Sequence, residues 1–301
     1  MLLLFRFLSR LPLRLLHAIG AAAGWLTFLA SRTYRQRYLA NVRAAGLPWP
    51  AVRGGIAEAG RLMAELPWLW LRPIDKTLGP VVRWDGAGLI DAALAQGRGL
   101  VFLTPHLGCF EICAQAYAER FSQLDAPVTV LFRPARQAWL RRVVDSSRVR
   151  PGLATAPANL AGVRQMIRAL RKGHSIGLLP DQVPPQGLGL WVPFFGQPAY
   201  TMTLAGRLLQ QTGASALLIW GERLAKGRGY VVHVMPAPVI AADCTQESAA
   251  AAINQAMERL ILLAPAQYLW GYHRYKQPRG LDIGASPPPM PMPTSAPGQE
   301  S

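Results

Sequence analysis

The stretch Gly99-Leu-Val-Phe-Leu-Thr-Pro-His-Leu-Gly-Cys-Phe-Glu111 opens as a short apolar run. Leu100 to Leu103 has the composition of a buried strand. Pro105 ends this strand, because proline has no N–H to donate to a sheet. His106 then stands at the strand tip, and the residues after Glu111 can form a helix. The stretch therefore predicts a buried strand, a turn and a helix.

His106 and Glu111 form a candidate catalytic pair within this stretch. A carboxylate beside a histidine can hold the imidazole in one tautomer and stabilise the imidazolium that forms when it takes a proton. Five residues apart in one helix, the two side chains would lie on different faces, so the pair needs the turn that Pro105 and Gly108 favour. The alternative is a structural or solvated histidine, which is the commoner role for a histidine at a strand end.

The residues Thr-Pro-His-Leu-Gly-Cys-Phe-Glu resemble the His-x4-Asp/Glu block of glycerolipid and lysophospholipid acyltransferases. The glutamate, together with a glycine two residues after the histidine, resembles the lipid A biosynthesis (lauroyl/myristoyl) branch of that superfamily. Further blocks follow in the same order, and the resemblance covers about residues 1 to 276. It implies that His106 accepts a proton from an acceptor hydroxyl and that Glu111 orients it.

Charge and composition limit the partners of the chain. At 301 residues it suits one large domain or two small ones, half of it is hydrophobic, and its net charge is +16. A basic, apolar chain indicates an anionic partner, which can be nucleic acid, an anionic membrane face, or an acidic substrate or carrier. Nucleic acid is not expected, because no nucleic-acid motif is present and aromatic residues do not alternate with the arginines.

The three cysteines, Cys109, Cys113 and Cys244, indicate neither a disulfide framework nor a metal site, and they fit a reducing compartment. Cys109 lies three residues from His106, but its apolar neighbours favour a small core residue over a thiol nucleophile. No metal and no cofactor are expected apart from the acyl thioester co-substrate.

Residues 1–31 are predicted to be a membrane anchor helix. Leu15 to Ala30 runs without a formal charge and is flanked by arginines on both sides. The run is short for a spanning helix, so it either spans the membrane or lies in its interface. A buried core helix is the alternative, and a cleaved signal peptide fits less well. Residues 32–277 are predicted to be the acyltransferase domain, and residues 278–301, rich in Pro, Gly and Ser, a disordered tail.

Polar residues follow two further predicted strands. Arg133 comes directly after Val128–Phe132, and its guanidinium suits a phosphate group. Asp181 and Gln182 follow the strand that begins near His174, and their Pro-Asp-Gln motif resembles the lipid A branch. The resemblance implies that Arg133, and more loosely Arg164, bind the acceptor together with Asp181 and Gln182. Asp181 can instead position an arginine such as Arg133. The alternative to both functional roles is an aspartate that only stabilises a turn.

Residues 187–200 are predicted to be a loop rich in Gly and Pro, and Val192-Pro-Phe-Phe-Gly196 resembles a family segment suited to a lip for acyl chains. Tyr268-Leu-Trp270 resembles the closing block. Strands alternating with helices predict an α/β fold with a mixed, mainly parallel central sheet flanked by helices. His106, Arg133 and Asp181 then meet at the carboxyl ends of strands, where open α/β sheets bind ligands. Backbone amides near Gly108 are expected to stabilise the oxyanion.

The resemblance implies transfer of a fatty acyl chain from acyl carrier protein to an anionic glycolipid, a lipid A precursor, on the cytoplasmic face of the inner membrane. Transfer to a lysophospholipid or an ornithine lipid, from acyl-CoA or acyl carrier protein, is an alternative. A basic protein that binds membranes without catalysis is a second alternative.

Overall fold

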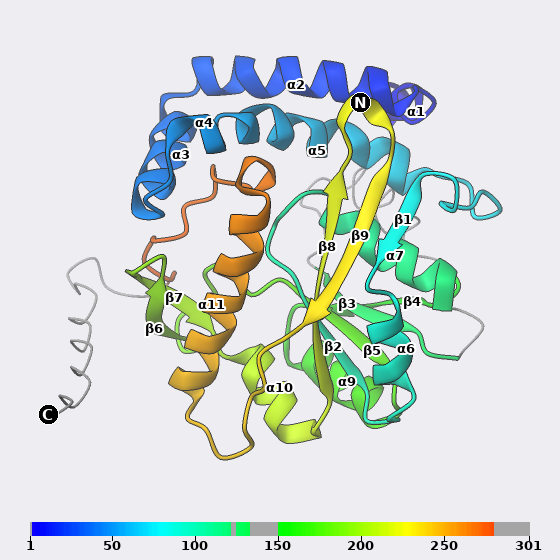
Figure 1. Ribbon diagram of the computed structural model, residues 1–301, viewed down its shortest axis with the longest axis vertical. Helices are drawn as coiled ribbons and strands as arrows, with labels where there is room; N and C mark the ends of the chain where they lie inside the picture. The colour runs from blue at the N-terminus through cyan, green and yellow to red at the C-terminus, as the bar shows by residue number, and fades with distance from the viewer. Residues whose placement is uncertain (1, 122–124, 133–149, 280–301) are drawn as a thin grey trace, which may run out of the picture.

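The computed structural model describes residues 2–121, 125–132 and 150–279 (Figure 1). The predicted site residue Arg133 lies outside these ranges, as does almost all of the predicted tail 278–301. The helices of the described residues are α1 Leu2–Leu8, α2 Leu13–Ala30, α3 Arg32–Ala44, α4 Trp49–Val52, α5 Gly54–Trp70, α6 Gly88–Leu94, α7 Phe110–Phe121, α9 Leu160–Arg171, α10 Leu204–Thr212 and α11 Gln246–Leu263. The strands are β1 Val82–Asp85, β2 Leu100–Leu103, β3 Val128–Phe132, β4 Leu153–Pro157, β5 Ser175–Leu178, β6 Gly189–Phe194, β7 Gln197–Met202, β8 Ser215–Arg223 and β9 Tyr230–Pro236.

Seven strands of the described residues form one sheet in the order β1-β9-β8-β2-β5-β3-β4. Every neighbouring pair is parallel except β8 and β9, which are antiparallel. The prediction of a mixed, mainly parallel sheet flanked by helices is therefore confirmed. The run predicted as a buried strand, Leu100 to Leu103, is the central strand β2, and all four of its residues are buried.

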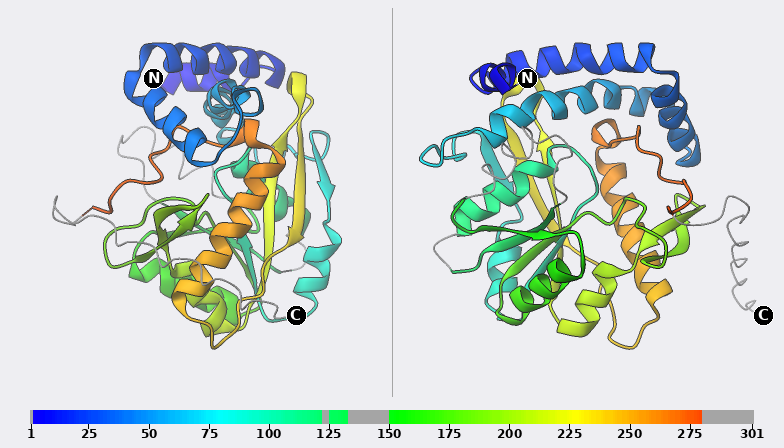
Figure 2. Two further views of the ribbon diagram at one scale, coloured as in Figure 1. Left: turned by 60° about the vertical axis from the view of Figure 1, so that its left-hand side comes forward. Right: turned by 180° about the vertical axis from the view of Figure 1, so that it is seen from behind.

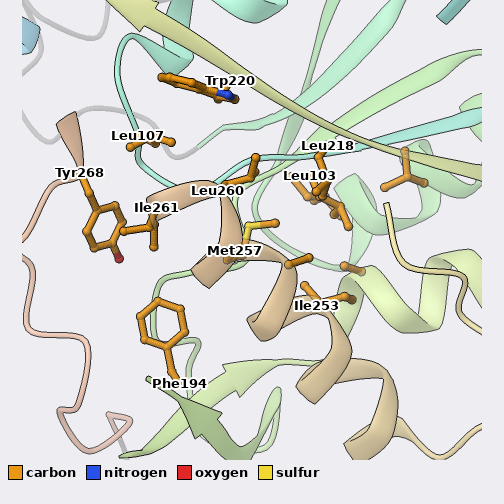
Figure 3. Packing of buried hydrophobic residues seen from close by; sticks show 14 of the residues in the cluster. Leu103, Leu107, Phe194, Leu218, Trp220, Ile253, Met257, Leu260, Ile261 and Tyr268 are labelled. Carbon is orange, nitrogen blue, oxygen red and sulfur yellow. The ribbon is translucent and has the colours of Figure 1, made fainter. Parts of the chain in front are cut away.

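Successive residues of β2 point to opposite faces of the sheet, and each face has its own core. Val101 and Leu103 join the cluster that α9, α10 and α11 cover, whereas Leu100 and Phe102 join the cluster under α6 and α7. Figure 3 shows the first of these cores, where Ile253, Met257 and Leu260 of α11 approach the sheet. A strand buried on both faces explains why the run shows no polar alternation.

The first helices form a separate layer at one end of the sheet, across the top of the view in Figure 1 and again in both views of Figure 2. The backbones of α2 and α5 pack directly against each other, because glycines line the contact. A Cβ atom built on Gly20 would lie 2.6 Å from the carbonyl oxygen of Gly60. The buried residues of α2, which include Leu13, Leu16 and Gly20, recur every three or four positions, so one face of this helix is committed to α5.

Helix α2 is long and apolar enough to cross a membrane, with a mean hydropathy of 1.4, and one third of it is buried against the protein. The face of α2 that points away from α5 carries exposed apolar side chains, and α1 and α5 expose others nearby. The exposed apolar residues of these three helices are Leu3, Leu4, Phe7, Leu15, Ile19, Trp25, Leu26, Leu29 and Met63.

The segment predicted as a loop over residues 187–200 is a β-hairpin instead. Strands β6 and β7 pair in antiparallel register from Gly189 with Met202 to Phe194 with Gln197. The tight turn between them consists of Phe195 and Gly196, both at positive φ, 47° and 70°. Two residues with positive φ match the twist of a two-residue hairpin. The prolines at 193 and 198 hid this pairing, since proline usually argues against a strand.

Candidate active site

The turn that carries His106 follows from the sequence around it. The N–H of Thr104 still donates to Leu178 O at 3.2 Å, but Pro105 has no N–H, so the ladder between β2 and β5 stops there. Gly108 then adopts φ 57°, and a Cβ atom at this position would collide with the carbonyl oxygen of Gly221. Proline and glycine together therefore release His106 from the strand and allow α7 to begin four residues later.

Asp181 holds the backbone and the imidazole of His106 with one carboxylate. Its Oδ2 accepts the His106 N–H at 2.9 Å, and its Oδ1 lies 2.7 Å from His106 Nδ1. The two residues follow β2 and β5, which are parallel neighbours with Leu103 opposite Leu178. The expected meeting of His106 and Asp181 at the carboxyl end of the sheet is thus confirmed.

The Asp181 carboxylate is 2% exposed and stays ionised. Burial alone would raise its pKa, but the charge of His106 and the two hydrogen bonds from that residue outweigh burial, so the pKa is lowered. The fully buried Arg274 adds positive charge nearby. An ionised carboxylate on Nδ1 fixes the tautomer in which Nδ1 carries the proton and Nε2 is the basic nitrogen.

The other ring nitrogen of His106 points toward Gln182. The Gln182 amide nitrogen lies 3.0 Å from Nε2. Both side chains line a pocket of about 540 Å³ together with Leu131, Tyr272, Lys276 and Arg279. A hydroxyl group that enters this pocket and displaces the Gln182 amide would reach the basic nitrogen.

A smaller apolar pocket of about 50 Å³ shares Gly177, Leu178 and Leu179 with the first one. Phe110 lines it, and the Phe110 ring packs edge-on against the His106 imidazole with ring centres 4.9 Å apart. An apolar cavity beside a basic nitrogen suits a substrate that is part hydrocarbon and part polar.

Glu111, the predicted orienting residue, lies in the first turn of α7. Its Oε2 accepts a hydrogen bond from Trp70 Nε1 at 3.3 Å, which ties α7 to the end of α5. The carboxylate on Nδ1 of His106 is that of Asp181, a residue the sequence assigned to acceptor binding. The role of Glu111 toward the imidazole stays a prediction.

Arg164 is exposed on the second turn of α9, the helix that begins after β4. Among the residues the structure describes, it does not line either pocket beside His106. Its role in acceptor binding also stays a prediction. Lys276 and Arg279, by contrast, line the larger pocket. The sequence predicted Arg279 as part of the disordered tail 278–301, and gave no role to Lys276, which lies just before that tail.

The expectation that amides near Gly108 stabilise an oxyanion is wrong for Gly108 and Cys109. The Gly108 N–H donates to Gln267 O at 3.0 Å, and the Cys109 N–H donates to Gly221 O at 2.8 Å. These two amides fix the turn to the segments behind it. Cys109 is fully buried, and burial, followed by the charge of Glu65, raises the pKa of its thiol, so the interpretation as a core residue is confirmed.

The chain matches a known protein family over most of its length. The family described as bacterial lipid A biosynthesis acyltransferase matches residues 1–277. The chain is 26% identical to the lipid A biosynthesis palmitoleoyltransferase of Escherichia coli (strain K12) over 221 residues, which are 72% of this chain and 68% of that protein. It is 24% identical to the lipid A biosynthesis lauroyltransferase of the same strain over 255 residues, 84% of this chain and 76% of that protein.

A third relative acts on a different lipid according to its name. The chain is 28% identical to the phosphatidylinositol mannoside acyltransferase of Mycobacterium tuberculosis (strain CDC 1551 / Oshkosh) over 227 residues, 72% of this chain and 66% of that protein. Each of the three relatives is named as a transferase of an acyl group. This favours an enzyme over a basic protein that binds membranes without catalysis. With a histidine and a buried carboxylate at the end of its sheet, the chain belongs to the bacterial lipid A biosynthesis acyltransferase family and is an O-acyltransferase.

Proposed function

We propose that the chain transfers a fatty acyl chain from an acyl thioester of acyl carrier protein to a hydroxyl group of a lipid A precursor, with His106 as the general base. The observation that carries this proposal is the pair of His106 and Asp181. It fixes the Nδ1 proton and leaves Nε2 beside a pocket of about 540 Å³.

The chemistry needs one proton to move twice. His106 Nε2 takes the proton of the acceptor hydroxyl as its oxygen attacks the thioester carbonyl, and a C–O bond forms. The C–S bond then breaks, and the imidazolium returns its proton to the thiolate of the carrier. The buried Asp181 carboxylate stabilises the imidazolium between these two steps. Glu111, in the first turn of α7, is proposed to add a second negative charge near the ring.

The donor side of the proposal rests on shape and charge. The apolar pocket lined by Phe102, Phe110 and Tyr117 lies beside the imidazole and suits the first carbons of an acyl chain. The chain carries a net charge of +16, which favours association with an acidic carrier protein.

The acceptor side rests on cations that line the larger pocket. Lys276 and Arg279 lie among its lining residues, and both bind phosphate oxygens well. Arg133 and Arg164 are proposed as further contacts to the acceptor, and Gln182 as the group that its hydroxyl displaces from His106. A lipid A precursor is a phosphorylated sugar lipid and offers both the hydroxyl and the phosphate.

A second acceptor class is a phosphoglycolipid built on another headgroup. The similarity to a phosphatidylinositol mannoside acyltransferase favours this alternative over a lysophospholipid or an ornithine lipid. The same base, pocket and cations would serve both glycolipids, because each combines a sugar hydroxyl with an anionic phosphate.

We also propose that α1 and α2 lie along the cytoplasmic face of the inner membrane. One face of α2 is committed to α5 through Gly20 and Gly24, so a spanning α2 would have to draw the charged residues of α5 toward the bilayer. The opposite face exposes Leu26 and Leu29 by 68% and 67%. The exposed arginines around it, which suit anionic headgroups, are Arg6, Arg10, Arg14, Arg32 and Arg37.

Mass spectrometry of reaction products tests the function. Detergent-purified protein is incubated with acyl carrier protein thioesters and with a panel of lipid A precursors, phosphatidylinositol mannosides and lysophospholipids. One added acyl chain on a lipid A precursor, lost in His106→Ala, is the expected result. Acylation of a phosphatidylinositol mannoside alone would move the protein to the second acceptor class, and full activity of His106→Ala would exclude His106 as the base.

A further inference from the structure

Arg223, the last residue of β8, has a buried guanidinium that lies between α5 and the turn of His106. Its Nε and Nη2 bind the two carboxylate oxygens of Glu65 at 2.9 and 2.5 Å, and its Nη1 binds Glu58 at 2.5 Å. The third acceptor lies outside α5: Nη2 also donates to the carbonyl oxygen of Gly108 at 3.3 Å. One guanidinium thus joins two glutamates of α5 to a backbone atom two residues from His106.

The main chain of Arg223 is attached to the same turn by a second route. Its N–H donates to Gln267 Oε1 at 2.9 Å, and its carbonyl oxygen accepts from Gln267 Nε2 at 3.1 Å. The carbonyl oxygen of Gln267 in turn accepts the Gly108 N–H at 3.0 Å. Both polar groups of the Gly108 peptide backbone are therefore held by Arg223 or by the residue paired with it.

This cluster also reaches the first helix layer. Glu65 Oε2 lies 3.0 Å from His17 Nε2 of α2 and accepts the Tyr230 hydroxyl of β9 at 2.8 Å. Burial would raise the pKa of Glu65, but the charge of Arg223 and the hydrogen bonds from Arg223 and His17 lower it to about 2. The carboxylate is therefore ionised and fully bonded.

A buried ion pair is a costly way to stabilise a fold. The loss of hydration often exceeds the attraction between the charges, and apolar side chains of similar volume serve stability as well or better. A guanidinium can hold several acceptors at fixed angles, because its five N–H donors form a rigid planar fork. The acceptors here are two helix carboxylates and the Gly108 carbonyl oxygen, and the last of these belongs to the turn of the proposed base.

We propose that Arg223 is a positioning residue for the acyl transfer: together with Glu65 it fixes the turn 106–109, and thereby His106, against the helix layer formed by α2 and α5. The proposal rests on the proposed role of His106 as the base. A base displaced by about 1 Å can lose about a hundredfold in rate, so a rigid turn is a requirement for turnover.

Two variants of this cluster test the proposal with purified, full-length protein. Arg223→Lys keeps the positive charge for Glu65 but lacks the fork that also reaches Gly108. The double variant Glu65→Leu with Arg223→Met removes both charges of this pair together, and Glu58 keeps Arg61 as its ionic partner. We expect kcat to fall about 10- to 100-fold in both, with KM within about threefold of the wild type, at a temperature where thermal melts show that each variant is folded.

The matched control is Arg72→Lys. Arg72 also pairs with a glutamate, Glu119, and with Gln115, but the pair joins the segment after α5 to α7 without a contact to the turn. We expect this variant to keep its kcat. If Arg72→Lys lost as much activity as Arg223→Lys, or if the kcat loss only followed a fall in melting temperature, the cluster would be structural and the proposal wrong.

The same assay separates this proposal from the proposed function. An inactive His106→Ala beside a fully active Arg223→Lys would overturn the positioning role alone. An active His106→Ala would overturn the role of the base and the positioning role with it. Loss of kcat in both Arg223 variants, with KM close to that of the wild type and at a temperature where both are folded, supports the positioning role.

Discussion

The Nδ1 atom of His106 lies 2.7 Å from Oδ1 of Asp181, a residue 75 positions later in the chain. The same carboxylate accepts the His106 backbone N–H at 2.9 Å, so ring and main chain are oriented by one group. A histidine held in this way has one tautomer, and its basic Nε2 faces the pocket once the Gln182 amide is displaced, which is what a general base requires.

Asp181→Asn should lower kcat by about a hundred- to ten-thousandfold while KM changes little, because an amide cannot stabilise the imidazolium by charge. Steady-state kinetics with a saturating acyl thioester measure the change. Gln182→Ala serves as the neighbouring control, and we expect it to stay within about tenfold of wild-type kcat, since Gln182 contacts the nitrogen that the substrate takes over. An Asp181→Asn variant with wild-type kcat would remove Asp181 from the mechanism.

Glu111→Gln examines the second carboxylate. We expect kcat to fall at least about tenfold, because the imidazolium loses a stabilising negative charge near the start of α7. Glu111 also accepts from Trp70, so Trp70→Phe, which removes that donor and keeps the ring, is assayed beside it. Equal losses in the two variants would mean that Glu111 acts by anchoring α7 to α5 and not through its charge.

Lys276→Gln should raise the KM of the acceptor about tenfold at unchanged kcat, because a hydrogen bond to a charged group contributes about 1.5–3 kcal/mol. Lys172, exposed at the far end of α9, provides a lysine of the same charge that does not line the pocket. Lys172→Gln should leave KM unchanged. A KM that responds equally to both changes would indicate a general effect of net charge.

The stability of the protein should depend on Glu65 at acid pH. The folded-state pKa of Glu65 is about 2 and its ordinary value is 4.5, so the unfolded chain binds more protons between these values and stability rises with pH there. The stabilisation is present above pH 4.5 and is lost as the pH falls toward 2. Urea titrations should show a shallower acid loss for Glu65→Gln, and a loss as steep as that of the wild type would contradict this.

Binding to vesicles that contain anionic phospholipid should require the exposed face of α2. Leu26→Glu and Leu29→Glu place charges on that face and should abolish sedimentation with vesicles without lowering the melting temperature. Leu160→Glu, on a residue of α9 that is 74% exposed, should leave binding intact. Retained binding of the α2 variants would place the membrane contact elsewhere.

The central strand and the position of His106 could be predicted because they depend on local chemistry. Four apolar residues before Thr104 and Pro105 define a buried strand and its end without help from the rest of the chain. The place of Asp181 at a neighbouring strand tip followed from the general rule for open α/β sheets. The sequence could not show that the carboxylate on His106 Nδ1 is that of Asp181, because this contact depends on β5 lying next to β2 in the sheet.

Other features escaped prediction for similar reasons. The hairpin of β6 and β7 contains Pro193 and Pro198, which oppose each other in register and read locally as loop residues. The sequence analysis assigned no role to Arg223, because its partners Glu58 and Glu65 lie more than 150 residues earlier in the chain. The Gly108 amide looked free in the sequence, but its partner Gln267 belongs to a segment near the end of the chain.

The strand order also has a consequence for how the protein is made. Strand β2, which precedes His106, lies between β8 and β5, and β1 pairs with β9. The first strand of the sheet can therefore pair only after the last strand has been synthesised. Contacts so distant along the chain form slowly, and a ribosome exposes them only after most of the sequence has been synthesised. The apolar helices α1 and α2 emerge long before that. With α1 and α2 on the membrane as proposed, the nascent chain would reach a lipid surface before His106 and Asp181 are paired, and the proposed site would form where a lipid acceptor is already dissolved.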